Sequence, residues 1–137
     1  MNQNYKFKTL TITNHGRIRE NQEEEIEKLN VFTRGDSKTI DFKLKSGLRQ
    51  CFHYSHFITG WFGKEDERQV IKMFFSTHLV TIGGYCLEEL YDHLIEHKVK
   101  NITENDERYA SMVDEGKVFV TEIDIAWKKE SSDSIPD

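Results

Sequence analysis

QVIKMFFSTHLVTIGGYCLEELYDHLIEHKVKNI, residues 69–102, is the stretch of sequence that decides the fold. Its first part holds two runs rich in β-branched and aromatic residues, at 70–75 and 79–82, separated by a short polar break. Residues of these types favour extended backbone, so the two runs predict a pair of strands joined by a tight turn. Gly83 and Gly84 follow, and we expect them to form the turn that leads into a helix.

The second part of this stretch predicts one amphipathic helix over residues 87–98. Its apolar side chains recur at helical spacing, which places them in one stripe. They are Leu87, Leu90, Tyr91, Leu94 and Ile95. The opposite face carries acidic residues together with His93 and His97. We therefore expect the stripe to belong to the core and the other face to meet water.

Further strands are predicted on both sides of this stretch. Residues 39–45 alternate between apolar and polar side chains, as a half-buried strand does. Ser46-Gly47 occupies the place of a hairpin turn before a strand over residues 48–58. Residues 60–67 have the composition of an exposed loop, and residues 117–127 predict the last strand. One short strand is also expected after the helix, at 99–102.

Strands joined by tight turns, with one strong helix before a final strand, indicate an α+β fold. We expect an antiparallel sheet that curls into a roll or partial barrel, with the helix over one opening. A chain of 137 residues is long enough for one core and too short for two. We therefore predict a single globular domain over residues 1–127 and a mobile polar tail over 128–137.

Charge is unevenly distributed along the chain. The formal net charge is -5, but residues 1–50 carry a net +3 and residues 51–137 a net -8. A negative net charge argues against nucleic-acid binding as the main function, because affinity for nucleic acid comes largely from basic side chains that neutralise phosphates. A local basic face is the basis of an alternative function, a nucleic-acid-associated accessory protein. Its contacts would be Lys6, Lys8, Arg17, Arg19, Lys43, Lys45 and Arg49.

The cysteines and the hydropathy pattern indicate in which cellular compartment the protein is expected. Cys51 and Cys86 are the two thiols, and no pattern of a secretory signal opens the sequence, which favours reduced, packed cysteines. The longest uncharged stretch, residues 50–63, is interrupted by His and small polar residues and does not resemble a membrane span. We expect a cytoplasmic protein without membrane contact.

Phe57, Trp61 and Phe62 form a denser aromatic group than one strand end requires, and they border a charged segment. Large aromatic side chains supply much of the energy of protein interfaces when they are exposed. They are therefore the predicted partner-binding residues. Buried instead, they would close one end of the sheet.

The histidines offer a metal site and a ligand pocket as alternatives. His93 and His97 have the i, i+4 spacing that lets two imidazoles reach one metal. No Glu follows His93 directly, as it would in the zinc protease motif, so we interpret this helix face as solvated and predict no metal or cofactor. A pocket inside the curled sheet near His53, Tyr54 and His56 would serve a small-molecule or metal-binding protein. His56, on the apolar side of its strand, is expected in the core.

No group of residues in the sequence has the pattern that catalysis requires, so we predict no enzyme activity and no catalytic residues. The leading hypothesis is a non-catalytic cytoplasmic module for protein interaction or regulation, which acts through a sheet edge or the aromatic group. A small domain with several strands has at least one sheet edge to cover. We therefore expect a two-fold homodimer. We also expect a protein partner, whose identity the sequence does not give.

Overall fold

The computed structural model of the protein describes residues 30–129. Their strands are β1 (Phe32–Arg34), β2 (Thr39–Lys43), β3 (Arg49–His53), β4 (Phe57–Glu65), β5 (Arg68–Phe75), β6 (His78–Tyr85), β7 (Val99–Thr103) and β8 (Phe119–Trp127). The main helix is α2 (Glu88–Ile95), and two short 3-10 segments are η1 (Tyr54–His56) and η2 (Glu107–Met112). The α+β class is confirmed.

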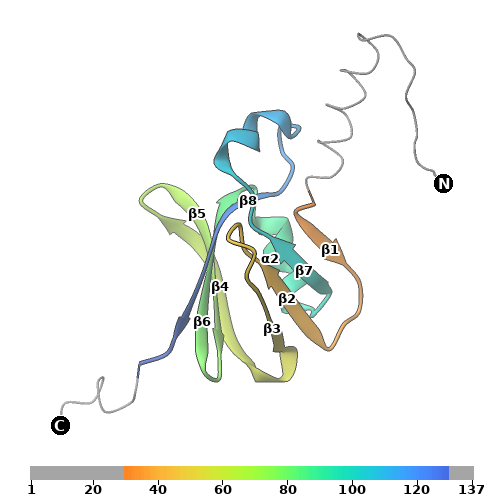
Figure 1. Ribbon diagram of the computed structural model, residues 1–137, viewed down its shortest axis with the longest axis vertical. Helices are drawn as coiled ribbons and strands as arrows, with labels where there is room; N and C mark the ends of the chain where they lie inside the picture. The colour runs from red at the N-terminus through yellow and green to blue at the C-terminus, as the bar shows by residue number, and fades with distance from the viewer. Residues whose placement is uncertain (1–29, 130–137) are drawn as a thin grey trace.

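The described strands form two sheets that do not close into a barrel (Figure 1). One sheet has the order β1-β7-β2-β3 and the other β4-β5-β6-β8. Neighbouring strands are antiparallel except β2 and β7, which run parallel with Asp41 beside Asn101. That parallel pair departs from the expected antiparallel sheet. It joins segments far apart in the chain, which no local pattern reveals.

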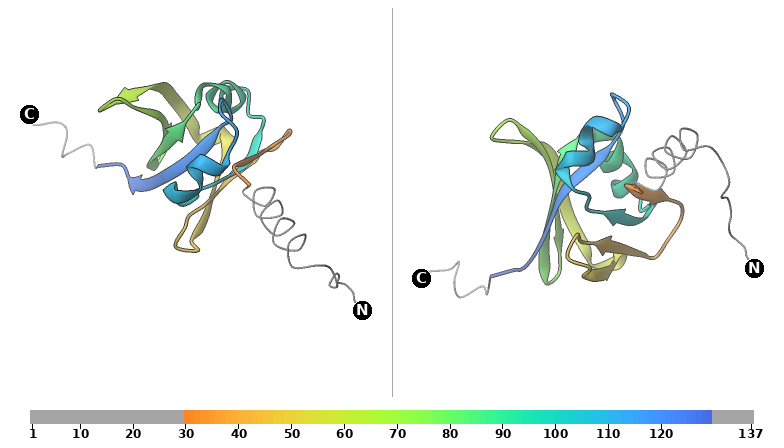
Figure 2. Two further views of the ribbon diagram at one scale, coloured as in Figure 1. Left: turned by 90° about the horizontal axis from the view of Figure 1, so that it is seen from above. Right: turned by 45° about the horizontal axis from the view of Figure 1, so that its top comes forward.

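The core lies between the two sheets, and α2 fills one side of the space (Figure 2). Ile40, Phe42 and Phe52 come from the first sheet, while Ile71 and Ile82 come from the second. From the helix, the buried core residues are Leu87, Leu90 and Leu94. The predicted helical stripe is thus confirmed over most of its length. Ile95, however, is half exposed, because the helix ends there rather than at residue 98.

The predicted pair of strands in residues 69–102 is confirmed as β5 and β6, but Gly83-Gly84 is not a turn. Both glycines lie inside β6, beside β8. A Cβ atom on Gly84 would overlap the carbonyl oxygen of Phe119, so the neighbouring strand approaches too closely for any side chain. The glycines mark a close backbone contact and a bulge, which produce the same sequence signal as a turn.

That bulge reverses the facing of side chains along β8. Gly83 pairs with Glu122 and Gly84 with Val120, so Thr121 is the extra residue. Val120 and Ile123 consequently both belong to the core, although strict alternation would place them on opposite faces. The predicted final strand is confirmed as β8. Strict alternation over residues 117–127 predicts Val120 on the face opposite Ile123, and that prediction is wrong because of the bulge.

Two other expectations are corrected around β4. Residues 60–67 are not a loop, because β4 continues to Glu65 and the turn is only Asp66-Glu67, both with positive φ. The predicted strand over residues 48–58 is interrupted by η1, where the chain passes from one sheet to the other. The hairpin at Ser46-Gly47 is confirmed, but its loop has three residues, 45–47, rather than two: the N–H of Leu44 donates to the Leu48 carbonyl and the N–H of Gly47 to the Leu44 carbonyl.

Candidate functional site

The predicted aromatic group is divided between the two faces of β4. Phe57 and Phe62 are half-buried and pack against the core. Trp61 points to the outer face and is 38% exposed, because side chains alternate along a strand. A bulge near residue 58 keeps Phe57 on the same side as Phe62. The three rings therefore do not form one surface, and their role in partner binding stays a prediction.

Tyr54 is buried in the core, whereas the two neighbouring histidines, His53 and His56, are exposed. Its hydroxyl donates to the carbonyl of Val99 at 2.6 Å, and burial raises the pKa of Tyr54. His56 is exposed and contacts Ser76, so the expectation of a core histidine is wrong. The 3-10 turn breaks the strand alternation and leaves the His53 and His56 rings 6.3 Å apart.

His93 and His97 make separate contacts instead of sharing a site. His93 Nε2 lies 3.7 Å from the Glu89 carboxylate on the same helix. His97 lies beyond the helix end with positive φ, and its ring stacks on Tyr54 with centroids 4.5 Å apart. Within residues 30–129 no group of three or more His, Cys, Asp or Glu side chains could hold a metal ion.

The predicted basic residues are only partly within the described chain. Arg49 pairs with Asp41 at 2.5 Å across the β2–β3 hairpin, which neutralises its charge locally. Lys43 lies opposite Arg49 on β2, and Lys45 follows that strand. The other four, Lys6, Lys8, Arg17 and Arg19, lie outside the described residues. A nucleic-acid contact through this set stays a prediction.

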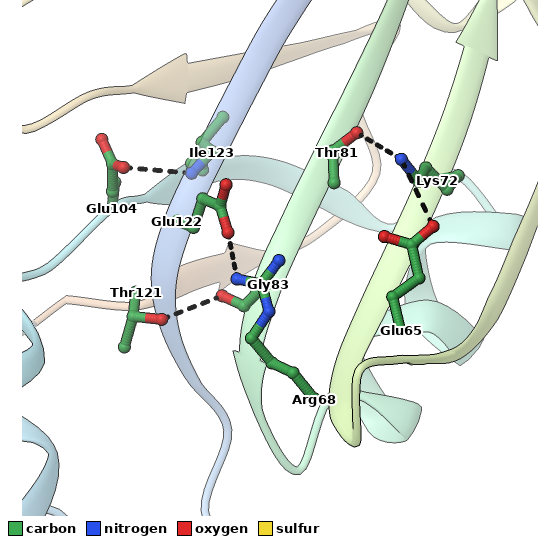
Figure 3. A network of polar contacts seen from close by, with 9 residues as sticks. All are labelled: Glu65, Arg68, Lys72, Thr81, Gly83, Glu104, Thr121, Glu122 and Ile123. Carbon is green, nitrogen blue, oxygen red and sulfur yellow. Dashed lines mark hydrogen bonds and ion pairs between the residues drawn. The ribbon is translucent and has the colours of Figure 1, made fainter.

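A polar network covers the outer face of the second sheet (Figure 3). Lys72 on β5 contacts the Glu65 carboxylate at 3.7 Å and the Thr81 hydroxyl at 3.1 Å. Arg68 reaches across β6 to form an ion pair with Glu122 on β8. These pairs link β4, β5, β6 and β8 at the surface. They are partly exposed, so each contributes little to stability.

Two glycines shape this outer face. Val70 belongs to it and yet is fully buried. Its neighbours across the sheet are Gly63 and Gly83. The Trp61 ring lies over Gly63, and the Arg68 guanidinium lies over Gly83. The absence of side chains at both glycines lets these two large groups lie close to the sheet and shield Val70 from water.

Two cavities meet at Tyr85 and Cys86, at the end of β6. One has a volume of about 400 Å³ and is walled by residues including Phe119, Ala110 and Val113. The second, of about 460 Å³, is more polar and is lined by Lys64, Glu67, Arg68, Gln69, Gly84, Glu107 and Thr121. The hydroxyl of Tyr85 donates to the Glu107 carboxylate, and this hydrogen bond raises the pKa of Tyr85. The predicted pocket near His53 does not coincide with either cavity.

Strand β8 has an edge that is closed at one end and open at the other. Among residues 30–129 no strand pairs with β8 on the side away from β6. Near its start, the N–H of Asn105 donates to the Val120 carbonyl, and Glu104 accepts from the N–H of Ile123. Along a strand, the N–H and C=O groups of successive residues point alternately toward and away from the neighbouring strand. The N–H of Lys128 points toward β6 and donates to the Thr77 carbonyl. The backbone groups of Trp127 and Ile125 therefore point away from β6, along the outer edge of the sheet.

The open half of this edge also carries an exposed indole. Trp127 is 75% exposed, and its ring lies 4.1 Å, centroid to centroid, from that of His78. Glu104, Ile125 and Trp127 were not among the functional residues predicted from the sequence. The Trp at the end of the last strand was the only available signal. Which strands form sheet edges depends on the strand order, which is a tertiary property.

Comparisons with known proteins add no identity. No family model, no curated protein and no solved structure matches this chain. No described helix has the length and apolar character needed to cross a membrane.

Proposed function

We propose that this protein is a non-catalytic interaction module that binds an extended strand at the open edge of β8. The observation that supports this most directly is the row of outward backbone groups at Ile125 and Trp127, with which no strand in the described part of the chain pairs. An added strand gains main-chain hydrogen bonds along such an edge, and side chains beside it give specificity. Trp127 supplies the large exposed side chain at this position.

The rest of β8 supports the same interpretation. An open strand edge is an aggregation hazard, and proteins commonly blunt it with charge or cover it. Here Glu104 and Asn105 cover the first half of the edge. The second half is left open beside an aromatic side chain. Both cysteines are free, which fits the reducing cytoplasm that we propose as its location; Cys86 is half-buried, but Cys51 is exposed rather than packed as expected.

Proline substitution tests the edge directly, because proline removes one N–H. Ile125→Pro deletes an outward donor and leaves the hydrogen bonds to β6 in place. The matched control is Cys51→Pro, since the N–H of Cys51 also points outward, from the edge strand β3 of the other sheet. Circular dichroism and thermal midpoints establish that both variants fold.

The binding probe is a panel of nine-residue peptides with alternating Val and Thr and charged ends. Binding is followed by amide chemical shifts in NMR spectra of the full chain. We expect peptides from the panel to shift the Ile125 and Trp127 amides, and Ile125→Pro but not Cys51→Pro to abolish binding. The proposal fails if no peptide moves these amides, or if Ile125→Pro binds as well as the parent.

The apolar cavity favours a second candidate function, the binding of a small apolar ligand. Its volume of about 400 Å³ is within the range of ligand sites, and Phe119 forms part of its wall. Val113→Trp should fill the cavity and abolish binding of the fluorescent probe anilinonaphthalene sulfonate. Equal probe fluorescence for the variant and the parent would exclude this cavity as the site.

A further inference from the structure

The free part of the β8 edge has definite limits. Glu104 occupies the N–H of Ile123, although the carbonyl of that residue stays available on the same side. At the other end β8 stops at Trp127. The free segment is therefore Ile123–Trp127, and its midpoint is Ile125. Any strand that pairs here without displacing Glu104 has to make its backbone hydrogen bonds within that length, while the side chains of the flanking residues on either end can still face one another.

We infer that the strand added to this edge is β8 of a second copy of the chain, antiparallel, with Ile125 opposite Ile125 on a two-fold axis. This inference rests on the proposed function, because it names the partner of the same edge. An isologous contact pairs each residue with its counterpart about the axis. Centring the free segment on its own midpoint uses its whole length in both copies.

Charges on the outer face agree with this register. With Ile125 on the axis, Glu122 lies opposite Lys128 of the second copy, and Asp124 lies opposite the small Ala126. Opposite charges directly across an antiparallel pair are stabilising. The carboxylate of Glu122 already contacts Arg68 on its other side, so it would lie between two cations.

Neighbouring registers are less favourable. An axis at Asp124 would place two Asp carboxylates directly opposite one another, which is destabilising. An axis at Ala126 would pair Asp124 with Lys128 but would take Glu122 away from that lysine. Of the three, the axis at Ile125 alone places a cation opposite Glu122 and avoids an opposed like-charge pair.

The inner face gives the apolar part of the contact. In the same register, Trp127 of the second copy lies opposite Ile123 and diagonal to Ile125, which is half-buried. Aromatic and β-branched side chains form favourable pairs across strands. The indole, 75% exposed in one chain, would thereby be covered. A short strand pair buries less surface than a standard stable interface, so we expect dissociation in the micromolar range.

A charge swap on the full chain tests both the partner and the register. Glu122→Lys alone and Lys128→Glu alone each place two like-charge pairs at the interface, so each should dimerise at least tenfold more weakly than the parent. Mixed together, they restore both pairs, because a lysine then faces a glutamate at each of the two positions where charges meet. Lys129→Glu is the matched control, since Lys129 would lie opposite the uncharged Thr121. Thermal midpoints confirm that every variant is folded.

Sedimentation equilibrium from 1 to about 200 µM gives the readout. The parent and Lys129→Glu should shift from 16.2 kDa toward twice that mass, with both single variants at least tenfold weaker and their mixture recovering. A mixture that stays monomeric overturns the register, and a parent at 16.2 kDa throughout overturns the second copy. If the strand peptides still shift the Ile125 amide in that case, the proposed function survives. If they do not, both proposals fail together.

Discussion

The carboxylate of Glu104 connects the two sheets, and its removal should destabilise the fold. Just after β7, Oε1 accepts the N–H of Lys45 at 2.9 Å and Oε2 accepts the N–H of Ile123 at 3.1 Å. Its own N–H donates to the Lys43 carbonyl at 2.8 Å. One residue thus joins the end of β2 in the first sheet to the edge strand β8 in the second.

The two hydrogen bonds that the Glu104 carboxylate accepts contribute unequally to the free energy of unfolding. Hydrogen bonds to a charged group contribute about 1.5 to 3 kcal/mol, and the loss is largest where a donor stays buried without a partner. The N–H of Lys45 is exposed, so water replaces the carboxylate there at little cost. The N–H of Ile123 is part-buried. We therefore expect Glu104→Ala to lower the unfolding free energy by about 2 kcal/mol, mainly through Ile123.

Glu104→Gln should have a smaller effect, of about 1 kcal/mol or less. Its one carbonyl oxygen can accept from Ile123, while its amide turns to the exposed side near Lys45. Urea unfolding with linear extrapolation measures both variants, and Glu115→Ala in the exposed loop is the control for loss of one negative charge. If Glu104→Ala lies within about 0.5 kcal/mol of the parent, the carboxylate does not stabilise the junction between the sheets.

Leu94→Ala should cost about 2 to 5 kcal/mol in urea unfolding because the side chain is buried, whereas half-exposed Ile95→Ala should cost under about 1 kcal/mol; equal losses would contradict the assigned helix face. Gly84→Ala should lower the free energy of unfolding by about 3 kcal/mol or more, because the added Cβ would meet the backbone of Phe119. Gly83→Ala should lower it by about 1 kcal/mol or less, because the flexible Arg68 side chain can move aside. If Gly83→Ala melts at a lower temperature than Gly84→Ala, the close approach of β8 to Gly84 is refuted. Burial raises the pKa of Tyr54, so the folded state holds the phenolic proton more tightly than the unfolded state. Stability should consequently fall as pH rises above about 10, and Tyr54→Phe should show a shallower fall in alkaline urea titrations; identical slopes would argue against Tyr54 as the source.

Local periodicity was sufficient to find most of the elements. The stripe through Leu87, Leu90 and Leu94 predicted the helix, because a helix that buries one side must repeat its apolar residues at that spacing. The β-branched and aromatic runs of β5 and β6 predicted strands for the corresponding reason. The sequence indicated less about the candidate site, because the identity of an aromatic residue does not show whether it is buried or exposed. Phe62 packs against the core, whereas Trp127 is exposed.

The sequence by itself determined the α+β class, the apolar face of α2 and the hairpin at Ser46-Gly47, because those features depend on residues close together in the chain. Tertiary structure alone decided that β7 inserts between β1 and β2, that Gly84 lies against Phe119, and that β8 is an edge strand. Each of these depends on contacts between distant segments, whose pairing is selected by how the whole core packs rather than by local conformational preference. The open edge at Ile125 follows from that strand order.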